Sequence, residues 1–272
     1  MKIARIHEFG GPDVIRLDDV PLPVPGPAEV LVRVAATSFN PTEGWLRRGM
    51  VPMPVTLPFA FGWDVAGTVV ESGEQVVGFL DGGAAAEFVA APRERLVSAP
   101  RNVPLHHAAA LPLAGLTAWQ AVAQARLRPG ERVLVNGAGG GIGGIVVQLA
   151  KRAGAHVIAT ASPRSAAAVR AFGADEVVDY TLAPLPQDAD VVLNLVGTAD
   201  VPAGARTVSI TTKVGTHVVT RYDRTELAEL VALVESGELA LDVTEVLPLD
   251  AIAEVHGRGE VGDIRGKIVL TP

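Results

Sequence analysis

The segment that decides the fold is ERVLVNGAGGGIGGIVVQLAKRAGAHVIATAS, residues 131–162. An apolar strand is predicted over 132–136, and it runs into the glycine loop 137–143. An apolar helix over 142–153 and a second strand over 156–160 follow directly. Strands that alternate with helices in this way predict an α/β fold built on a parallel sheet.

The glycine loop has the composition of a dinucleotide-binding turn. Glycines between a strand and a helix let the chain turn tightly, let the backbone approach a pyrophosphate and let the helix pack closely on the strand. The N-terminus of the helix presents free N–H groups to an anion. No Gly-Lys-Ser/Thr follows the loop, so a P-loop is excluded. The alternative is a tight strand-to-helix turn that binds nothing.

The end of the second predicted strand bears on the choice of cofactor. Sites for NAD usually carry an acidic residue there, which binds the ribose 2′-hydroxyl. This chain instead continues Thr160-Ala161-Ser162-Pro163-Arg164. A hydroxyl and a guanidinium suit a 2′-phosphate, which a carboxylate would repel. The sequence therefore predicts NADPH rather than NADH, and the alternative for Arg164 is an exposed residue in the first turn of a helix.

The α/β alternation continues beyond the glycine loop. Strands are predicted over 176–178, 190–196 and 207–211, and helices over 165–172 and 225–236. The segment 197–206 is too short for a loop plus a helix of ordinary length. One helix of the sheet is therefore expected to be missing.

The residues before about 105 have a different character. Short β-type runs are predicted over 3–7, 30–36, 64–71 and 86–91, and the proline-rich stretch 21–27 excludes a helix or a central strand. From 104 to 124 the pattern becomes helical. The last residues, 266–270, have the pattern of a final strand that could close the sheet of the first domain.

Composition excludes several classes of function. The 272 residues suffice for two domains, and 49% of them are hydrophobic, which predicts compact folding. A net charge of −7 argues against nucleic-acid and membrane-surface partners, which need a basic surface. The chain has no cysteine, so disulfides and cysteine-based zinc or iron–sulfur sites are excluded. No membrane helix or signal peptide is apparent, which predicts a cytoplasmic location.

Several motifs, in one order, resemble the zinc-free branch of the medium-chain dehydrogenase/reductase superfamily, the quinone oxidoreductase-like and enoyl reductase-like proteins. They are SFNPTEGWLRRG, FGWDVAGTV, AALPLAGLTAWQAV, VLVNGAGGGIG, AFGADEVVDY and IRGKIVL. The resemblance extends over nearly the whole chain. It implies a GroES-like, β-rich catalytic domain from residues 1–117 and 238–272, and an inserted Rossmann domain, a doubly wound parallel sheet that binds NADP, from residues 118–237.

The resemblance also implies a set of site residues. Asn40 and Thr117 should lie near the nicotinamide and its ribose, and Trp45 should lie in the catalytic cleft. The remaining positions are implied to bind the cofactor, with Gly137, Gly140 and Gly143 at the small-residue positions, Gly140, Ile142 and Gly143 around the pyrophosphate, Ser162, Arg164 and Tyr180 around the 2′-phosphate, and Gly141, Val196 and Gly197 beside them. Tyr180 has the alternative of a packed strand residue.

No metal is expected. The resemblance places Asn40 and Trp63 where zinc-dependent relatives have a cysteine and a histidine ligand, and neither side chain can bind zinc. Without zinc to polarise an alcohol, an activated acceptor is favoured. The expected function is therefore an NADPH-dependent reductase that transfers hydride to a quinone, an enone or another conjugated C=C acceptor. A second copy of the chain, in a homodimer, is a possible partner.

Two departures from the family pattern favour an alternative. Trp45 replaces a tyrosine that could donate a proton, which leaves water, Thr42 or a ribose hydroxyl as the donor. The chain is also short, with apparent deletions near 71–79 and 197–206. The alternative is a non-redox protein of the same fold, a nucleotide-binding regulator or a cyclase that uses the same cleft.

Overall fold

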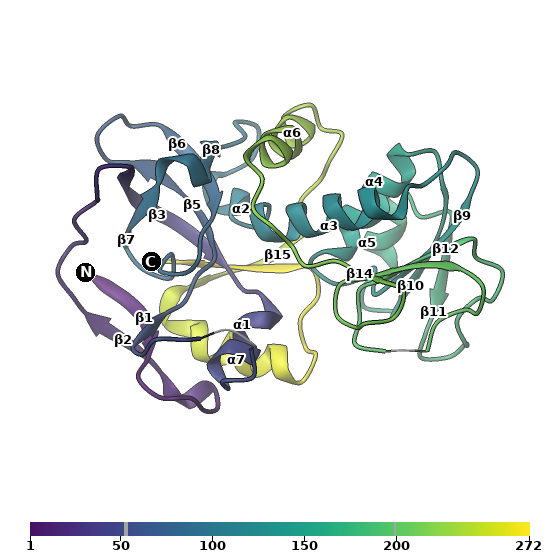
Figure 1. The fold of residues 1–272 in the computed structure, drawn as a ribbon, viewed down its shortest axis with the longest axis horizontal. Coiled ribbons are helices and arrows are strands. Elements are labelled where there is room, and N and C mark those ends of the chain that lie inside the picture. Colours follow the sequence, from purple (N-terminus) through teal and green to yellow (C-terminus); the bar gives the residue numbers. More distant parts are fainter. Residues whose placement is uncertain (52–53, 199) are drawn as a thin grey trace.

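The computed structural model describes residues 1–51, 54–198 and 200–272, and these form two lobes that are connected through the middle of the molecule (Figure 1). The strands at the two ends of the chain lie in one lobe, and the middle of the chain forms the other. The first is the GroES-like lobe, and the second is the Rossmann lobe. No helix in the described ranges is long and apolar enough to cross a membrane.

Six parallel strands form the sheet of the Rossmann lobe in the described residues, in the order β11-β10-β9-β12-β13-β14. Numbered along the chain this order is 3-2-1-4-5-6, the arrangement of dinucleotide-binding sheets. The strands are β9 (Arg132–Asn136), β10 (His156–Ala161), β11 (Glu176–Asp179), β12 (Val191–Asn194), β13 (Arg206–Ser209) and β14 (Thr216–His217), and the helices are α3 (Pro112–Ala125), α4 (Gly143–Arg152), α5 (Ala166–Ala171) and α6 (Arg224–Glu235).

Only one face of this sheet is covered by helices. Val133 and Val135 of β9 pack in the large core with residues of α3, α4 and α6. Leu134 faces the opposite side, because side chains alternate along a strand, and it packs with residues of β10, β12 and the segments 185–189 and 201–205. The strand order is thus that of a doubly wound fold, but loops replace the helices of the second face in the described residues.

The shortness of 197–206 accounts for part of this difference. Between β12 and β13 no helix occurs in the described residues, as the length of the segment predicts. Ala199, which belongs to this segment, lies outside the described residues. The other apparent deletion, 71–79, corresponds to a tight turn in which Val69 N–H donates to Glu74 O at 2.9 Å, followed by strand β6.

The GroES-like lobe is built mainly on antiparallel strands, with one parallel pair formed by residues 243–248 and 267–271. In the described residues one sheet has the order β15-β16-β3-β5-β6-β8, with β7 beside β3, and a smaller sheet has the order β2-β1-β4. The strands are β1 (Lys2–Ile6), β2 (Ile15–Asp19), β3 (Glu29–Ser38), β4 (Phe59–Ala60), β5 (Asp64–Val69), β6 (Gln75–Phe79), β7 (Phe88–Pro92), β8 (Leu96–Ser98), β15 (Val243–Pro248) and β16 (Lys267–Thr271). The helices are α1 (Pro41–Arg47), α2 (Leu105–Ala108) and α7 (Ile252–Glu260), with 3-10 turns at Pro12–Val14, Arg93–Arg95 and Leu249–Ala251.

The helical pattern over 104–124 forms two helices rather than one. α2 ends at Ala108 and α3 begins at Pro112. Proline has no N–H for the helix ladder and its ring clashes with the preceding turn, so it starts a helix better than it continues one. The predicted domain boundary at 117/118 falls inside α3.

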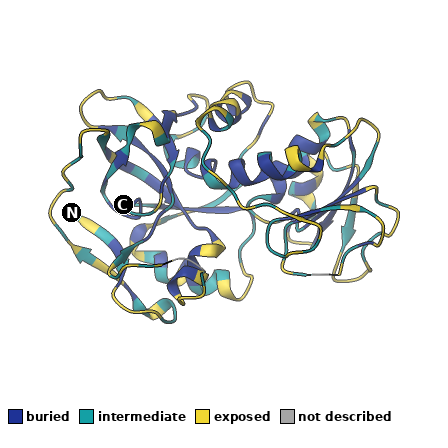
Figure 2. Ribbon diagram, in the orientation of Figure 1, coloured by how far each residue is buried: buried dark blue, intermediate teal, exposed yellow. Residues whose placement is uncertain are grey.

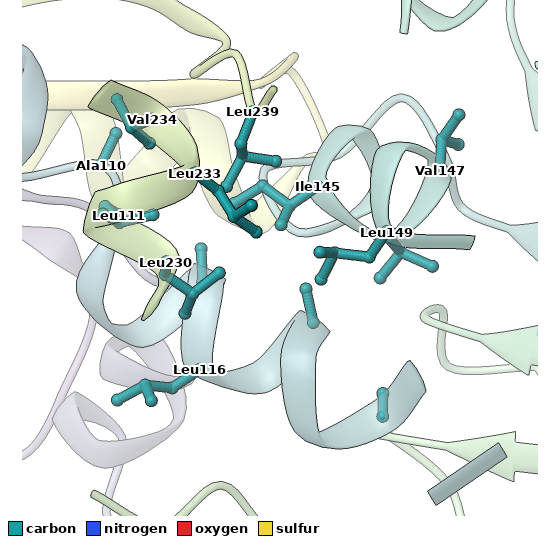
Figure 3. Packing of buried hydrophobic residues seen from close by; sticks show 14 of the residues in the cluster. Ala110, Leu111, Leu116, Ile145, Val147, Leu149, Leu230, Leu233, Val234 and Leu239 are labelled. Carbon is teal, nitrogen blue, oxygen red and sulfur yellow. The ribbon is translucent and has the colours of Figure 1, made fainter. Parts of the chain in front are cut away.

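α3 lies in the buried middle of the molecule (Figure 2). It packs against α4 and α6 of the Rossmann lobe, and against β5 and β6 of the GroES-like lobe. Figure 3 shows apolar side chains from α3, α4 and α6 in this core, among them Leu116, Ile145 and Leu230. This shared core fixes the position of the glycine loop relative to the GroES-like lobe.

Candidate functional site

A cavity of about 650 Å³ opens beside the glycine loop, at the carboxyl ends of the parallel strands. Ligands of open α/β sheets bind at this end, where the strand order reverses between β9 and β12. The residues that line the cavity are Asn136, Gly137, Gly139, Gly140, Thr160, Ala161, Ser162, Arg164, Ser165, Tyr180, Ala183, Pro184, Leu185, Gln187, Leu195, Val196, Thr198, Asp200, Gly262, Ile264 and Arg265.

Three glycines of the loop have different roles. Gly137 has φ +94°, which disfavours a side chain, and a Cβ there would lie 2.6 Å from Val196 Cγ1. A Cβ on Gly143 would lie 2.5 Å from the carbonyl oxygens of Gly137 and Ala138, so this glycine permits the close packing of α4 on the loop. A Cβ on Gly140 would meet only the Gly137 carbonyl oxygen, at 3.6 Å. The space beside Gly140, which we call the cradle, is therefore open, and a side chain at this position would fill it.

Polar side chains at the strand ends hold the loop in place. Thr160 Oγ1 accepts from the Gly137 N–H at 2.8 Å and donates to Asn136 Oδ1 at 3.0 Å. Asn136 Nδ2 in turn donates to Asn194 Oδ1 at 3.0 Å, so the ends of β9, β10 and β12 are joined. The signal in the sequence is a polar residue at the end of each apolar strand, which the sequence analysis did not use.

The residues expected around a 2′-phosphate line the cavity. Ser162, Arg164 and Tyr180 all line it, and more than half of the Tyr180 surface is exposed. Arg164 is already engaged, since its Nη1 lies 2.7 Å from Asp263 Oδ1 and its Nη2 donates to Gly262 O at 3.1 Å. This partner comes from the loop between α7 and β16, and no local sequence pattern predicts it.

Asn40 lies in a buried polar cluster that does not line the cavity. Its Oδ1 accepts from Lys267 Nζ at 2.8 Å, and its Nδ2 donates to Asp64 Oδ2 at 2.8 Å and Ser38 O at 3.2 Å. Asp64 also accepts from Ser38 Oγ and, at 2.7 Å, from Leu113 N–H. Both N–H groups of the Asn40 amide are thus occupied within the protein.

Burial shifts the pKa of two charged groups in this cluster. Burial raises the pKa of Glu43 to about 7, and N–H donation from Gly62 opposes the shift. Burial lowers the pKa of Lys267, against the stabilising charges of Asp64 and Glu43. Lys267, Asp64 and Glu43 were not predicted as site residues. Each lies in a segment that resembles the family, IRGKIVL, FGWDVAGTV and SFNPTEGWLRRG, but these segments are far apart in the chain and no local pattern shows that the three side chains meet.

The other expected catalytic residues do not line the cavity. Thr117 is buried, where its Oγ1 donates to Leu113 O at 2.7 Å and lies 2.7 Å from Thr220 Oγ1. Trp45 is 43% exposed on α1. The cavity thus gathers six of the expected cofactor-binding residues, Gly137, Gly140, Ser162, Arg164, Tyr180 and Val196, whereas Asn40, Trp45, Thr117, Gly141, Ile142, Gly143 and Gly197 are not among its lining residues.

The comparison with known proteins decides the family. Residues 26–101 match the alcohol dehydrogenase GroES-like domain, and residues 141–232 and 204–270 match two models of zinc-binding dehydrogenases. The chain is 30% identical over 307 aligned positions to an NADPH-dependent alkenal/one oxidoreductase of Arabidopsis thaliana chloroplasts, an alignment that covers 100% of this chain and 80% of the relative. The chain belongs to the medium-chain dehydrogenase/reductase superfamily, in its quinone oxidoreductase-like branch.

Solved structures of this superfamily have the same arrangement. The quinone oxidoreductase from Coxiella burnetii superposes with a TM-score of 0.92 at 28% identity, over 100% of this chain and 99% of that one. A mycobacterial protein solved with NADPH superposes with a TM-score of 0.85 at 27% identity, over 100% of both chains. The chain is an oxidoreductase of the quinone oxidoreductase and alkenal reductase kind, in a superfamily that binds NAD(P)H.

Two of the matched family models are described as zinc-binding dehydrogenases, which raises the question of whether this chain has residues that could bind zinc. In the part of the chain that the structure describes, no group of three or more His, Asp or Glu side chains is placed to hold a metal ion. The cluster around Asn40 instead contains the buried ammonium of Lys267. The absence of zinc stays a prediction.

Proposed function

We propose that this superfamily member is an NADPH-dependent reductase that transfers hydride to a quinone, an enone or another conjugated C=C acceptor, without zinc. The observation that carries the proposal is the cavity at the glycine loop, with Ser162 and Arg164 at the end of β10 and no carboxylate at that strand end. Family membership supports the redox chemistry, and the cavity supports the cofactor.

The cavity fits a dinucleotide. Gly140 leaves open space beside the glycine loop, and α4 begins directly after the loop. The N–H groups of Gly140 and Gly143 donate within the loop, to Gly137 O at 3.2 Å and to Gly140 O at 3.1 Å. A pyrophosphate would therefore bind the N–H groups of Ile142 and of the residues of α4 that follow Gly143. Asn136 and Thr160 fix the loop in this conformation through the Gly137 N–H. We assign the pyrophosphate to Gly140, Ile142 and Gly143, and the 2′-phosphate to Ser162, Arg164 and Tyr180.

A bound NADPH would supply the hydride, and the chain supplies orientation and an environment. Trp45 cannot act as a general acid, and the Asn40 and Thr117 side chains are neutral. A conjugated acceptor needs little electrophilic help. Water then suffices to protonate the anion that forms when hydride adds to the acceptor. Lys267 Nζ donates to Asn40 Oδ1 at 2.8 Å and to Phe39 O at 2.9 Å, so these two oxygens already have a donor and are not free to bind a divalent cation.

The selectivity for NADPH can be tested by binding. NADPH should bind at least about tenfold tighter than NADH, which corresponds to about 1.4 kcal/mol or more. Arg164→Ala should remove most of this difference, because the guanidinium is the cationic partner assigned to the 2′-phosphate. Arg170→Ala is the matched control, since Arg170 is exposed on α5 and does not line the cavity. Equal affinities of the unmutated protein for NADPH and NADH would refute the preference.

The redox assignment can be tested by turnover. NADPH mixed with the protein and a simple quinone or enone should lose its nicotinamide absorbance, at a rate proportional to protein concentration. Absence of oxidation with every conjugated acceptor, in protein that still binds NADPH, would instead support a regulator or cyclase of the same fold.

A further inference from the structure

The loop between α7 and β16, residues 261–266, extends from the GroES-like lobe to the cofactor cavity. Gly262, Ile264 and Arg265 line the cavity together with the glycine loop. Gly266 pairs with Gly140 as an isolated parallel bridge, and its N–H donates to Gly139 O at 3.2 Å. This loop is therefore part of the wall on the side where the phosphates are assigned.

Asp263 connects this loop to the residue assigned to the 2′-phosphate. Arg164 Nη1 lies 2.7 Å from Asp263 Oδ1, and Nη2 donates to Gly262 O at 3.1 Å. Both terminal nitrogens of the guanidinium thus have partners on the loop. An ionised carboxylate offers only acceptors, and it carries the same sign of charge as a phosphate. A 2′-phosphate that binds Arg164 must displace Asp263 or lie against its negative charge.

We propose that Asp263 is a specificity-determining residue of the cofactor site, which competes with the 2′-phosphate for Arg164 and so reduces the preference for NADPH over NADH. NADH has no 2′-phosphate and leaves the pair between Arg164 and Asp263 intact. The inference rests on the proposed function, since it assigns the 2′-phosphate to Arg164.

Neighbouring charges do not replace Arg164 in this role. Arg265 also lines the cavity, but its Nη1 lies 2.8 Å from Asp242 Oδ2 and 3.1 Å from Asp242 Oδ1. The side chains of this pair are 27% and 20% exposed, against 49% and 62% for Arg164 and Asp263, so water screens the pair of Arg265 less and Arg265 is the less available cation. Asp200 lines the cavity as a further negative charge. Arg164 is thus the cation with which a 2′-phosphate would pair, at the cost of its contact with Asp263.

The size of the effect follows from exposure. The side chains of Arg164 and Asp263 are 49% and 62% exposed, and exposed ion pairs contribute little because water and salt screen them. Loss of the Asp263 charge should therefore change the affinity for a 2′-phosphate by about three- to tenfold, and not by orders of magnitude.

Binding of the adenosine portion alone tests the proposal without turnover. We would measure the dissociation constants of 2′,5′-ADP and 5′-AMP by calorimetry for the unmutated protein and Asp263→Asn. Asp19→Asn is the matched control, because Asp19 is 74% exposed and pairs with Lys2 in the GroES-like lobe, away from the cavity. It changes the net charge by the same amount. Arg164→Ala, alone and combined with Asp263→Asn, completes the set.

We expect Asp263→Asn to bind 2′,5′-ADP about three- to tenfold tighter than the unmutated protein does, and to bind 5′-AMP with an affinity within about twofold of that of the unmutated protein. Asp19→Asn should change neither affinity. The gain in affinity for 2′,5′-ADP should disappear when Arg164 is also replaced. An unchanged affinity for 2′,5′-ADP, an equal gain for 5′-AMP, an equal gain in Asp19→Asn, or a gain that persists without Arg164 would each overturn the proposal. Equal binding of the two ligands by the unmutated protein would count against the NADPH preference, whereas the response to Asp263→Asn still decides the role of Asp263.

Discussion

Gly140 is the residue whose missing side chain matters most for the proposed cofactor site. Its φ is not in the left-handed region, and a Cβ would find only the Gly137 carbonyl oxygen, at 3.6 Å. Gly140→Val should therefore fold, while its branched side chain occupies the cradle. We expect the affinity for NADPH to fall at least about 100-fold, or about 2.7 kcal/mol, in a calorimetric titration.

Gly143→Ala provides the contrast, because a Cβ there lies 2.5 Å from backbone atoms of the loop. This variant should lose thermal stability as well as affinity. Retention of NADPH affinity by a folded Gly140→Val protein would show that the pyrophosphate does not lie at Gly140.

Glu43 should make the stability of the protein depend on pH. Its folded pKa of about 7 lies above the ordinary glutamate pKa of 4.5, so the folded state favours the protonated form. The stabilisation of the folded state by the protonated Glu43 carboxyl group is fully present below pH 4.5 and is lost as the pH rises through 7. The shift corresponds to about 3 kcal/mol. Relative to Glu43→Gln, the free energy of unfolding of the unmutated protein should fall by about this amount between pH 4.5 and 7.5.

Urea unfolding at a series of pH values measures this difference. Burial lowers the pKa of His256 to about 3, which gives the opposite pH dependence, but both proteins contain this residue, so its effect cancels. A difference between the two proteins that does not change with pH would contradict the buried, protonated state of Glu43.

At the residue scale, motif residues were predictable and buried charge partners were not. Ser162 and Arg164 line the cavity because they follow a strand of the parallel sheet, which the sequence shows directly. Asn40 was expected to lie near the nicotinamide and its ribose, whereas its amide contacts with Asp64, Ser38 and Lys267 were not predicted. These contacts depend on how strands of distant segments pair, and no local pattern encodes them.

At the scale of elements, α6 joins the two lobes through its apolar stripe. Leu230 is fully buried, and its Cδ1 would lie 3.1 Å from a Cβ on Gly115 of α3 (Figure 3). Leu230→Ala should lower the free energy of unfolding by about 2–5 kcal/mol, because it removes buried methyl groups and leaves a cavity. Leu230→Met, which keeps the volume, should cost less than about 1.5 kcal/mol. Similar losses for the two variants in urea unfolding would contradict this packing.

The helices that the sequence predicted and missed differ for a physical reason. α4 and α6 have continuous apolar stripes and were predicted to within two residues at each end. α7 was missed, since it contains Gly257 and Gly259, which disfavour a helix. A Cβ on Gly259 would lie 2.4 Å from Phe39 Cζ, so close packing against the ring requires this glycine. Tertiary contact overrides the local preference here.

At the scale of the whole molecule, the order of motifs predicted both lobes, and the strand order of the Rossmann sheet follows from its connections. The residues that cover the second face of this sheet could not be predicted from the sequence. Leu134, Ile158 and Val192 are buried there under loop residues, because the short connections leave no room for helices. The sequence shows that a segment is short, but it does not show which other residues replace the missing helix.

In the proposed function, this molecule reduces a conjugated acceptor with hydride from NADPH and needs no metal. The most direct measurement uses NADPH deuterated at nicotinamide C4, prepared as each epimer, with an enone and with protein dialysed against a chelator. We expect one epimer to deliver deuterium into a C–H bond of the reduced enone. The rate should equal that of protein that was not dialysed against the chelator. The proposed function would be contradicted if neither epimer labelled the product, or if label transfer stopped after chelation and returned with Zn²⁺.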